Sequence, residues 1–532
     1  MRRWNGWGDD TIQYPLSAKA AAFLQAAIGP GTPQDEIPLP NVVARVPPSR
    51  LAPHALVSTD AYQRLLHARG QSLPDWVALR SGRIEAFPDG VAFPRSSQDI
   101  AELMSHAART GAALIPYGGG TSVVGHINPL ADGKPSITVN MRRLNRLASF
   151  SEVDQLATFG AGVSGPELEA QLRAHDYTLG HYPQSFEYST LGGWIATRSA
   201  GQQALLYGRI EDLFAGGTVV TPAGELTLAP FPASAAGPDL RQMVLGSEGR
   251  IGFITEATVR VAPLPASEQF LGLFFPDFVA GQAAVRKMVQ AQLPLSMLRL
   301  STASETETTL AMAGHERLLG LMGTMLKLRR VEEGRALLIA GLSGTERIVA
   351  AARRAALEIT GNWGAVNLGQ MVGRQWLKSR FQTPYLRNTL WAMGYAVDTL
   401  ETAAPWHRID TILEAIESAL SHTLEDEGER VHLFSHISHP YSSGASVYVT
   451  YIFRVASEPE LSLQRWHRLK TAASRAIGSS RGTISHQHGI GLDHRPYLAA
   501  EKGPLGMDVL AQVMACVDPS GLMNPGKLLK TE

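Results

Sequence analysis

Short apolar runs alternate with helical patterns between residues 83 and 266. The predicted strands cover residues 90–94, 112–115, 136–140, 156–163 and 217–222. Between them, residues 96–110 and 164–175 show the 3.6-residue period of amphipathic helices, and Ser97 is the predicted N-cap of the first. Strands that alternate with helices are typical of an α/β arrangement in this part of the chain.

After residue 267 the pattern changes to strand, long helix, strand. The predicted strands are 271–275, 297–301, 335–342 and 444–454, and the predicted helices are 280–292, 344–361 and 458–477. This order favours an antiparallel sheet covered by helices, so the fold class is α+β. The expected division is an N-terminal helical and extended arm (1–82), a first domain (83–266), a second domain (267–500) and a C-terminal segment (501–532) that returns to the first domain.

The amino-acid composition excludes several classes of function. The 532 residues are 44% hydrophobic and 18% charged with zero formal net charge, which gives no bulk attraction to nucleic acid. The single cysteine, Cys516, excludes an internal disulfide and a multi-cysteine metal site. No apolar run reaches about 18 residues, and the first residues lack the apolar core of a secretion signal. We expect a cytoplasmic protein without a metal.

One loop suggests the chemistry. Residues 116–122 read Pro-Tyr-Gly-Gly-Gly-Thr-Ser and follow a predicted buried strand. Consecutive glycines expose backbone N–H groups and tolerate positive φ, so the chain can wrap closely round an anion such as a pyrophosphate. The spacing fits neither the Rossmann fingerprint nor the P-loop. Taken alone, the loop is equally consistent with a glycine-rich turn between strands.

Three further motifs follow in order: Ser-Thr-Leu-Gly-Gly at 189–193, Gly-Ser-Glu-Gly-x-x-Gly-x-Ile-Thr-Glu at 246–256, and Asp-Pro-x4-Asn-Pro-Gly-Lys at 518–527. With the glycine loop, they resemble the FAD-linked oxidases of the vanillyl-alcohol-oxidase type. The resemblance implies FAD held between a two-subdomain FAD-binding domain and an α+β cap domain with an antiparallel sheet. The residues it assigns to the cofactor are Pro116, Tyr117, Gly118, Gly119, Gly120, Thr121, Ser122, Gln184, Ser185, Ser189, Thr190, Gly192, Gly193, Thr197, Ser199, Glu248, Gly249, Gly252 and Ile254.

Motifs at residues 3–8, 187–194, 207–213, 401–406 and 485–489 resemble the alkyldihydroxyacetonephosphate synthase family. The resemblance implies a transferase of ether lipid synthesis, which exchanges the acyl group of acyl-dihydroxyacetone phosphate for a fatty alcohol through an adduct at flavin N5. The implied partners are this lipid-like phosphorylated substrate and the alcohol. Peripheral contact with a membrane and a homodimer are left open.

The same resemblance assigns the site residues. The family's catalytic tyrosine lies in Tyr-x6-Tyr and falls on Tyr448. An essential arginine falls on Arg299, a substrate-binding arginine falls on Arg387, and His486 and His488 stand in a histidine tract. The family carries three consecutive histidines there, whereas this chain has Gln487 in the middle, which cannot accept a full proton.

Each assignment has a structural alternative. Tyr448 as an acid or base needs nearby cations, which Arg299 and the histidines would supply, because an unperturbed phenol has a pKa near 10. A tyrosine in an alternating strand is otherwise a packing residue. Arg299 could be a buried ion-pair partner and Arg387 a solvated helix charge. The two histidines could instead be core residues or metal ligands.

Rival functions follow from the same fold. Metal-using 2-hydroxy-acid dehydrogenases carry His-x6-His and Glu-His-Gly, and here Tyr441, Tyr448 and Gln487 replace three ligands, which disfavours that chemistry. An FAD-dependent oxidase or dehydrogenase of an alcohol, a phenol or a 2-hydroxy acid stays open, as does a flavin-binding protein without turnover. The glycine loop holds no nucleophile and His126 is a weak one, so we expect non-covalent FAD.

Overall fold

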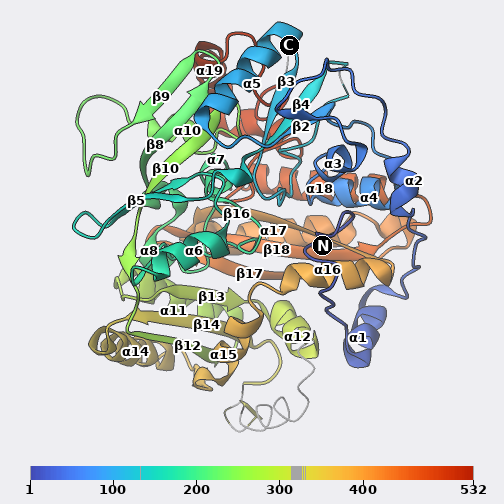
Figure 1. Cartoon of the computed structure of the whole chain (residues 1–532). Coiled ribbons are helices and arrows are strands. Elements are labelled where there is room, and N and C mark those ends of the chain that lie inside the picture. The colour runs from blue at the N-terminus through green and yellow to red at the C-terminus, as the bar shows by residue number, and fades with distance from the viewer. Residues whose placement is uncertain (1, 132, 313–325, 328, 330, 531–532) are drawn as a thin grey trace.

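The computed structural model describes residues 2–131, 133–312, 326–327, 329 and 331–530 (Figure 1). Its first sheet has the order β1-β2-β4-β3, with strands β1 Val57–Ser58, β2 Gly90–Ala92, β3 Ala113–Tyr117 and β4 Ser136–Asn140. Strands β2, β4 and β3 run parallel, and helix α5 (Ser97–Thr110) supplies the crossover between β2 and β3.

Helix α5 is amphipathic, with Ile100, Leu103 and Ala107 fully buried on its inner face. Its N-cap is Ser96, whose side chain accepts from the Asp99 amide, so the predicted cap at Ser97 is wrong by one residue. The helix ends at Gly111 in the left-handed conformation, which glycine adopts at little cost.

A second, antiparallel sheet has the order β5-β6-β10-β8-β9. Its strands are β5 Leu147–Ser151, β6 Leu156–Gly160, β8 Phe214–Thr221, β9 Gly224–Leu228 and β10 Phe253–Arg260. Helices α6 (Gly165–Arg173) and α7 (Leu191–Thr197) add apolar side chains to the same core as this sheet. The loops at 116–122, 184–193 and 246–252 approach one another closely, since Gly119 abuts Tyr188 and Gly249 abuts Pro116.

The cap is built on a seven-stranded sheet with the order β15-β12-β14-β13-β17-β18-β16, in which every printed pairing is antiparallel. Figure 1 shows it below the first two sheets. The strands are β12 Ser267–Phe275, β13 Met297–Ser301, β14 Ala336–Gly344, β15 Val366–Asn367, β16 Tyr395–Pro405, β17 His432–Pro440 and β18 Gly444–Arg454. This confirms the α+β class and the antiparallel cap.

The two faces of the cap sheet are covered differently. One face packs along its whole width against α11 (Phe278–Gln290), α14 (Glu346–Gly361), α17 (Ile409–His422) and α18 (Pro459–Ser479) in one continuous apolar core. On the other face, α12 (Ala303–Met312) and α15 (Gln370–Ser379) cover the β12–β14 end, and α1 (Ala18–Ile28) and α16 (Thr383–Ala392) cover the β16–β18 end. The middle strands of that second face are left for polar side chains.

The remaining elements are short or connecting. They are α2 Leu39–Val43, α3 Ala61–Leu66, α4 Leu73–Ser81, η1 Met141–Arg143, β7 Tyr177–Thr178, α8 Ala204–Tyr207, α9 Ile210–Leu213, α10 Arg241–Val244, β11 Ala262–Pro263, η2 Trp406–Arg408, η3 Glu425–Glu427 and α19 Arg495–Val517. Beyond α19, the chain runs beside β3, where the Leu114 amide donates to the Leu522 carbonyl and the Asn524 amide donates to the Leu114 carbonyl. The domain limits stay a prediction.

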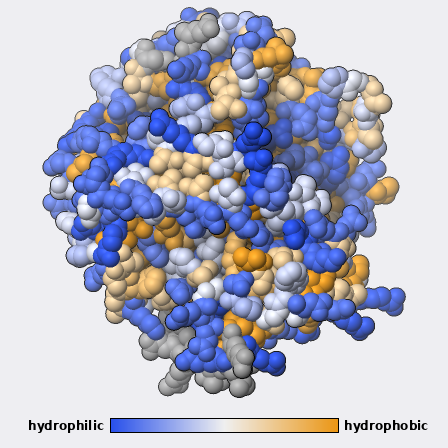
Figure 2. All heavy atoms as spheres, turned by 180° about the vertical axis from the view of Figure 1, so that it is seen from behind, coloured by the Kyte–Doolittle hydropathy of each residue, from blue (hydrophilic) through white to orange (hydrophobic). Residues whose placement is uncertain are grey.

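Hydrophilic residues cover most of the rear face, and hydrophobic residues gather there in small patches (Figure 2). Among the described residues, no helix combines the length and apolar character that crossing a bilayer requires.

Candidate active site

A row of polar side chains crosses four neighbouring strands on the second face of the cap sheet. Tyr448 of β18 stands opposite both His436 of β17 and Glu401 of β16, and Ser301 of β13 stands opposite His436. Directly paired residues in antiparallel strands share a face. Arg299, two residues before Ser301, therefore shares this face, while the alternate residues of β18 enter the apolar core behind it.

Arg299, the first residue of the row, forms a partly buried ion pair. This is the structural alternative that the sequence analysis gave for it. Its guanidinium contacts the carboxylate of Glu305, and the other oxygen of Glu305 lies 2.8 Å from Nδ1 of His436. Burial raises the pKa of Glu305, but Arg299 and His436 outweigh it and lower that pKa to about 2. The His436 ring stacks on Tyr448 with centroids 5.1 Å apart, so Arg299 reaches Tyr448 only through intermediates.

We expect Arg299→Leu to lower the free energy of unfolding by about 3 kcal/mol at neutral pH, because it removes the cation that pairs with the buried Glu305 carboxylate and leaves only the contact with His436. Since the folded pKa of Glu305 is depressed, the stabilisation is present above its unfolded value and is lost as pH falls toward 2. Urea titrations at pH 7 and about pH 3 measure the difference, which should shrink in acid. Arg353→Leu, which removes an exposed arginine of α14, is the control.

Tyr448 is surrounded by groups that keep its phenol protonated. Burial raises its pKa well above 10, Glu401 and Asp398 add to the rise, and Arg387 opposes it. Burial also lowers the pKa of His488, whose ring stands edge-on to Tyr448 with centroids 5.5 Å apart. The expectation that Arg299 and histidine cations lower the tyrosine pKa is therefore wrong.

Glu401 holds the loop of residues 485–491, called here the histidine loop, in place through hydrogen bonds. The sequence singled out Glu401 only as part of the 401–406 motif. It is fully buried, and one carboxylate oxygen accepts from the backbone amides of Gln487 and His488, the latter at 2.6 Å. Nδ1 of His486 and Nδ1 of His488 lie 3.8 and 4.0 Å from its oxygens. Burial raises the pKa of Glu401, but the neighbouring imidazoles and backbone amides outweigh burial and hold that pKa far below its usual value. Since Gln487 contacts Glu401 through its backbone, the loop geometry does not require a histidine there.

Arg209 is a second residue that the sequence did not single out. It belongs to the 207–213 motif and reaches across to the cap, where Nη1 lies 2.8 Å from Nε2 of His486 and 3.3 Å from the Tyr441 hydroxyl. Tyr441, the first tyrosine of Tyr-x6-Tyr, also lies 2.6 Å from the same Nε2. His486 is therefore held in a cluster separate from Tyr448, while His488 faces Tyr448.

Arg387 links this row to the glycine loop. Its guanidinium lies 4.3 Å over the Trp76 ring, and Nη1 donates to the Gln71 carbonyl at 2.9 Å. The Gln71 amide in turn donates to the Ser122 carbonyl at 2.6 Å. Arg387 is thus an interior group between Tyr448 and the loop, which contradicts the solvated-helix alternative.

The three nucleotide-type loops meet closely enough to test whether a cofactor fits. A Cβ added at Gly119 would lie 1.9 Å from the Tyr188 carbonyl oxygen, and one at Gly118 would lie 2.2 Å from Oγ1 of Thr190. A Cβ at Gly249 would meet Pro116 at 2.8 Å. Within the described chain, the amides of Gly119 and Gly120 donate to no protein acceptor. This is the chemistry of a pyrophosphate cradle, so these residues fit FAD.

Several predicted cofactor residues use their side chains within the protein. The hydroxyl of Ser189 accepts from the Trp194 indole, Thr197 donates to the Gly193 carbonyl, and Ser199 contacts His181. Gln184 is exposed and donates to the Arg380 carbonyl at 2.6 Å. The other positions are structural in the following ways: Tyr117 is buried, Ser185 accepts from the Ser189 amide, Gly192 donates to Ala161, Gly252 abuts Val220, and Ile254 lies in β10.

Glu248 fastens the histidine loop to the FAD-binding side. Its carboxylate accepts from the amides of Ile490 and Gly491, and Oε1 lies 3.0 Å from Nε2 of His126. Nδ1 of His126 lies 2.8 Å from the Ser122 hydroxyl, so both ring nitrogens have close neighbours. Ser122 and His126 thus connect the glycine loop through Glu248 with residues 490–491. In the described part of the chain, no group of three acidic, histidine or cysteine side chains is placed to bind a metal.

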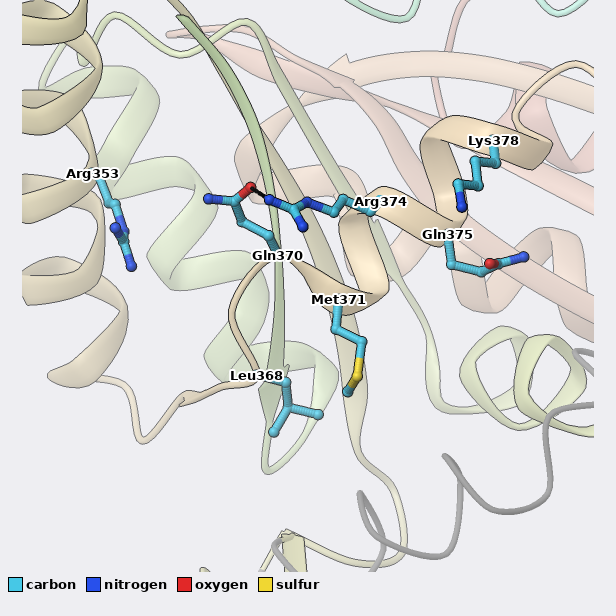
Figure 3. Close-up of a pocket in the computed structure, with 7 residues that line it drawn as sticks. All are labelled: Arg353, Leu368, Gln370, Met371, Arg374, Gln375 and Lys378. Carbon is cyan, nitrogen blue, oxygen red and sulfur yellow. Dashed lines mark hydrogen bonds between the residues drawn. The ribbon is translucent and has the colours of Figure 1, made fainter.

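A surface hollow of about 490 Å³ lies away from this site, on helices α14 and α15 of the cap (Figure 3). It is lined by Arg353, Leu368, Gln370, Met371, Arg374, Gln375 and Lys378. Figure 3 shows Arg353 entering from α14, with Arg374 bonded to Gln370 on α15. Among the described residues that line the hollow, Arg353, Arg374 and Lys378 are cationic and none is a carboxylate.

The fold and the loops define an FAD-binding flavoprotein with a cap domain. Residues 88–229 match the FAD binding domain family, and residues 264–528 match the C-terminal domain of FAD linked oxidases. The alkyldihydroxyacetonephosphate synthase of Dictyostelium discoideum is 30% identical over 89% of this chain and 78% of its own length. The Trypanosoma brucei brucei enzyme of that name is 28% identical over 99% and 92%.

A solved alkyldihydroxyacetonephosphate synthase structure superimposes with a TM-score of 0.84 and 26% identity, covering 98% of both chains. A mitochondrial D-lactate dehydrogenase of Saccharomyces cerevisiae is more distant, at 24% identity over 84% of this chain and 73% of its own length. The chain belongs to the alkyldihydroxyacetonephosphate synthase family. It is accordingly an FAD-dependent enzyme.

Proposed function

We propose that the protein exchanges the acyl group of an acyl-dihydroxyacetone phosphate for a fatty alcohol, with Tyr448, His488 and Arg387 as the working side chains. The observation that carries the proposal is the position of Arg387. An interior guanidinium stands between a protonated tyrosine and the glycine loop. A phosphorylated substrate bound there would place its carbon chain near Tyr448.

Each side chain then has one task. Arg387 binds the substrate phosphate, because its planar fork matches the oxygens of that anion. Tyr448, protonated at neutral pH, holds or donates the proton at the substrate carbon that loses its acyloxy group. His488 is neutral and can accept that proton in turn. FAD, when bound in its reduced form, would supply the nucleophilic ring nitrogen that the protein lacks.

The test is exchange of labelled fatty alcohol into an acyl-dihydroxyacetone phosphate under anaerobic conditions without an electron acceptor. Incorporation of label without net oxidation supports the proposal. Bleaching of the flavin by an alcohol or a 2-hydroxy acid, without exchange, would instead support the oxidoreductase alternative. Neither reaction would indicate a flavin-binding protein without turnover.

Non-covalent attachment of FAD is part of the proposal. The candidate nucleophile His126 is engaged by Ser122 on one nitrogen and Glu248 on the other. Denaturation is expected to release all of the flavin into the soluble fraction, and flavin that stays with the precipitated chain would contradict it.

We expect Arg387→Lys to raise KM for the phosphorylated substrate about 10- to 100-fold, because one charge-assisted hydrogen bond of the fork is worth about 1.5–3 kcal/mol. The value of kcat should change less, since lysine keeps the charge. Steady-state exchange at varied substrate measures both. Arg380→Lys is the matched control, because Arg380 lies over the Tyr182 ring on the same segment of the cap. An unchanged KM would remove Arg387 from phosphate binding.

Peripheral contact with a membrane is proposed at the basic hollow on α14 and α15. Arg353, Arg374 and Lys378 would meet anionic headgroups, while the exposed Met371 would enter the lipid surface. Flotation with phosphatidylglycerol vesicles should recover more protein than flotation with phosphatidylcholine, and replacing the three cations by glutamine should abolish the difference. Equal recovery would refute the contact. Formation of a homodimer is a separate prediction, which sedimentation velocity tests.

A further inference from the structure

His486 lies between two opposite charges that reach it from different parts of the chain. Nη1 of Arg209 lies 2.8 Å from its Nε2, and Nη2 donates to its backbone carbonyl at 2.9 Å. On the other side of the ring, Nδ1 lies 3.8 Å from Oε2 of Glu401. A guanidinium can only donate, so Nε2 must be the acceptor and the ring proton must sit on Nδ1.

The other groups around the ring agree with a neutral His486. The Tyr441 hydroxyl lies 2.6 Å from Nε2 and 3.3 Å from Nη1 of Arg209, so the tyrosine and the arginine both compete for the same lone pair. The centroid of the His439 ring lies 5.0 Å from that of His486, and Nε2 of His439 donates to the Gly201 carbonyl. Burial lowers the pKa of His439 well below 6.5. A proton added at Nε2 would face the N–H groups of Arg209.

Arg209 is itself firmly placed. Its Nε lies 2.9 Å from the Glu211 carboxylate, and Nη2 also donates to the Arg198 carbonyl at 3.1 Å. Burial lowers the pKa of Arg209, but Tyr441 and Glu211 outweigh burial and raise it above its usual value. The guanidinium is therefore a fixed cation against His486.

We propose that Arg209 is a positioning residue that holds His486 as a neutral imidazole with its proton on Nδ1, directed at Glu401. His488, which stands edge-on to Tyr448, is then the imidazole of the pair that exchanges a proton during the reaction. The tautomer of His486 follows from the geometry alone, whereas proton exchange by His488 rests on the proposed function.

The test uses the holoenzyme labelled with 15N-histidine, with the His486 signals assigned from their loss in His486→Asn. At neutral pH we expect an unprotonated Nε2 and a protonated Nδ1. In Arg209→Met, the chemical shifts of both ring nitrogens should change, because the guanidinium no longer fixes the tautomer. Arg209→Lys, which keeps the charge but loses the fork, should give a smaller change. Arg241→Met, which removes a cation paired with Asp239, should leave His486 unaffected.

A proton on Nε2 of His486 in the wild-type enzyme would overturn the proposal. So would an unchanged His486 in both Arg209 variants, provided that their flavin absorbance and circular dichroism match the wild type. For the second part, the acidic limb of the exchange pH profile should move in His488→Gln and not in Arg241→Met. If the wild-type enzyme shows no exchange, the proposed function fails while the tautomer result stands.

Discussion

Tyr448→Phe is expected to abolish exchange of labelled fatty alcohol while leaving FAD bound. The substitution removes one hydroxyl and keeps the ring, which stacks on His436 and lies edge-on to His488. Loss of a positioned proton donor lowers kcat by about 100- to 10,000-fold. Exchange kinetics and the visible absorbance of the same preparation measure the two effects together.

The matched control is Tyr395→Phe in the neighbouring strand β16. The hydroxyl of Tyr395 donates to the Gly29 carbonyl and accepts from the Gly31 amide, so its removal affects only the attachment of the arm. That variant should keep near-normal exchange. Near-normal activity of Tyr448→Phe would remove Tyr448 from the mechanism, and loss of FAD from Tyr448→Phe would point to a packing role instead.

The sequence predicted strands best where a short strand-forming run is bounded by loops. Strands β4, β13 and β18 have the predicted bounds. Strands β16 and β17 were not predicted. Their core-facing positions include Asp398 and Ser435, which bond to Trp466 of α18 and Glu417 of α17, so the apolar alternation that identifies a half-buried strand is broken.

The site residues, too, could be predicted from the sequence only in part. Tyr448, His488 and Arg387 were found through motifs, and the structure brings them together. Arg209 and Glu401 were not assigned roles, because their partners are 277 and 86 residues away along the chain. A charged residue in an isolated sequence is expected at the surface, and only the fold shows that backbone amides and imidazoles compensate Glu401 in the interior.

Gly119→Ala is expected to weaken the binding of FAD strongly. The new Cβ would lie 1.9 Å from the Tyr188 carbonyl oxygen and 2.6 Å from its carbon, and both are backbone atoms that cannot rotate away. The glycine loop must therefore move, which displaces the free amides that cradle the pyrophosphate. A cost of about 1–3 kcal/mol weakens FAD binding by about 10- to 100-fold. Fluorescence titration of the apoprotein with FAD measures the affinity. Gly478→Ala, at a helical position with no neighbouring atom within 4 Å, should bind FAD normally and be slightly more stable. Wild-type affinity in Gly119→Ala would show that the loop does not need its close approach to Tyr188, and the pyrophosphate would then have to be held elsewhere.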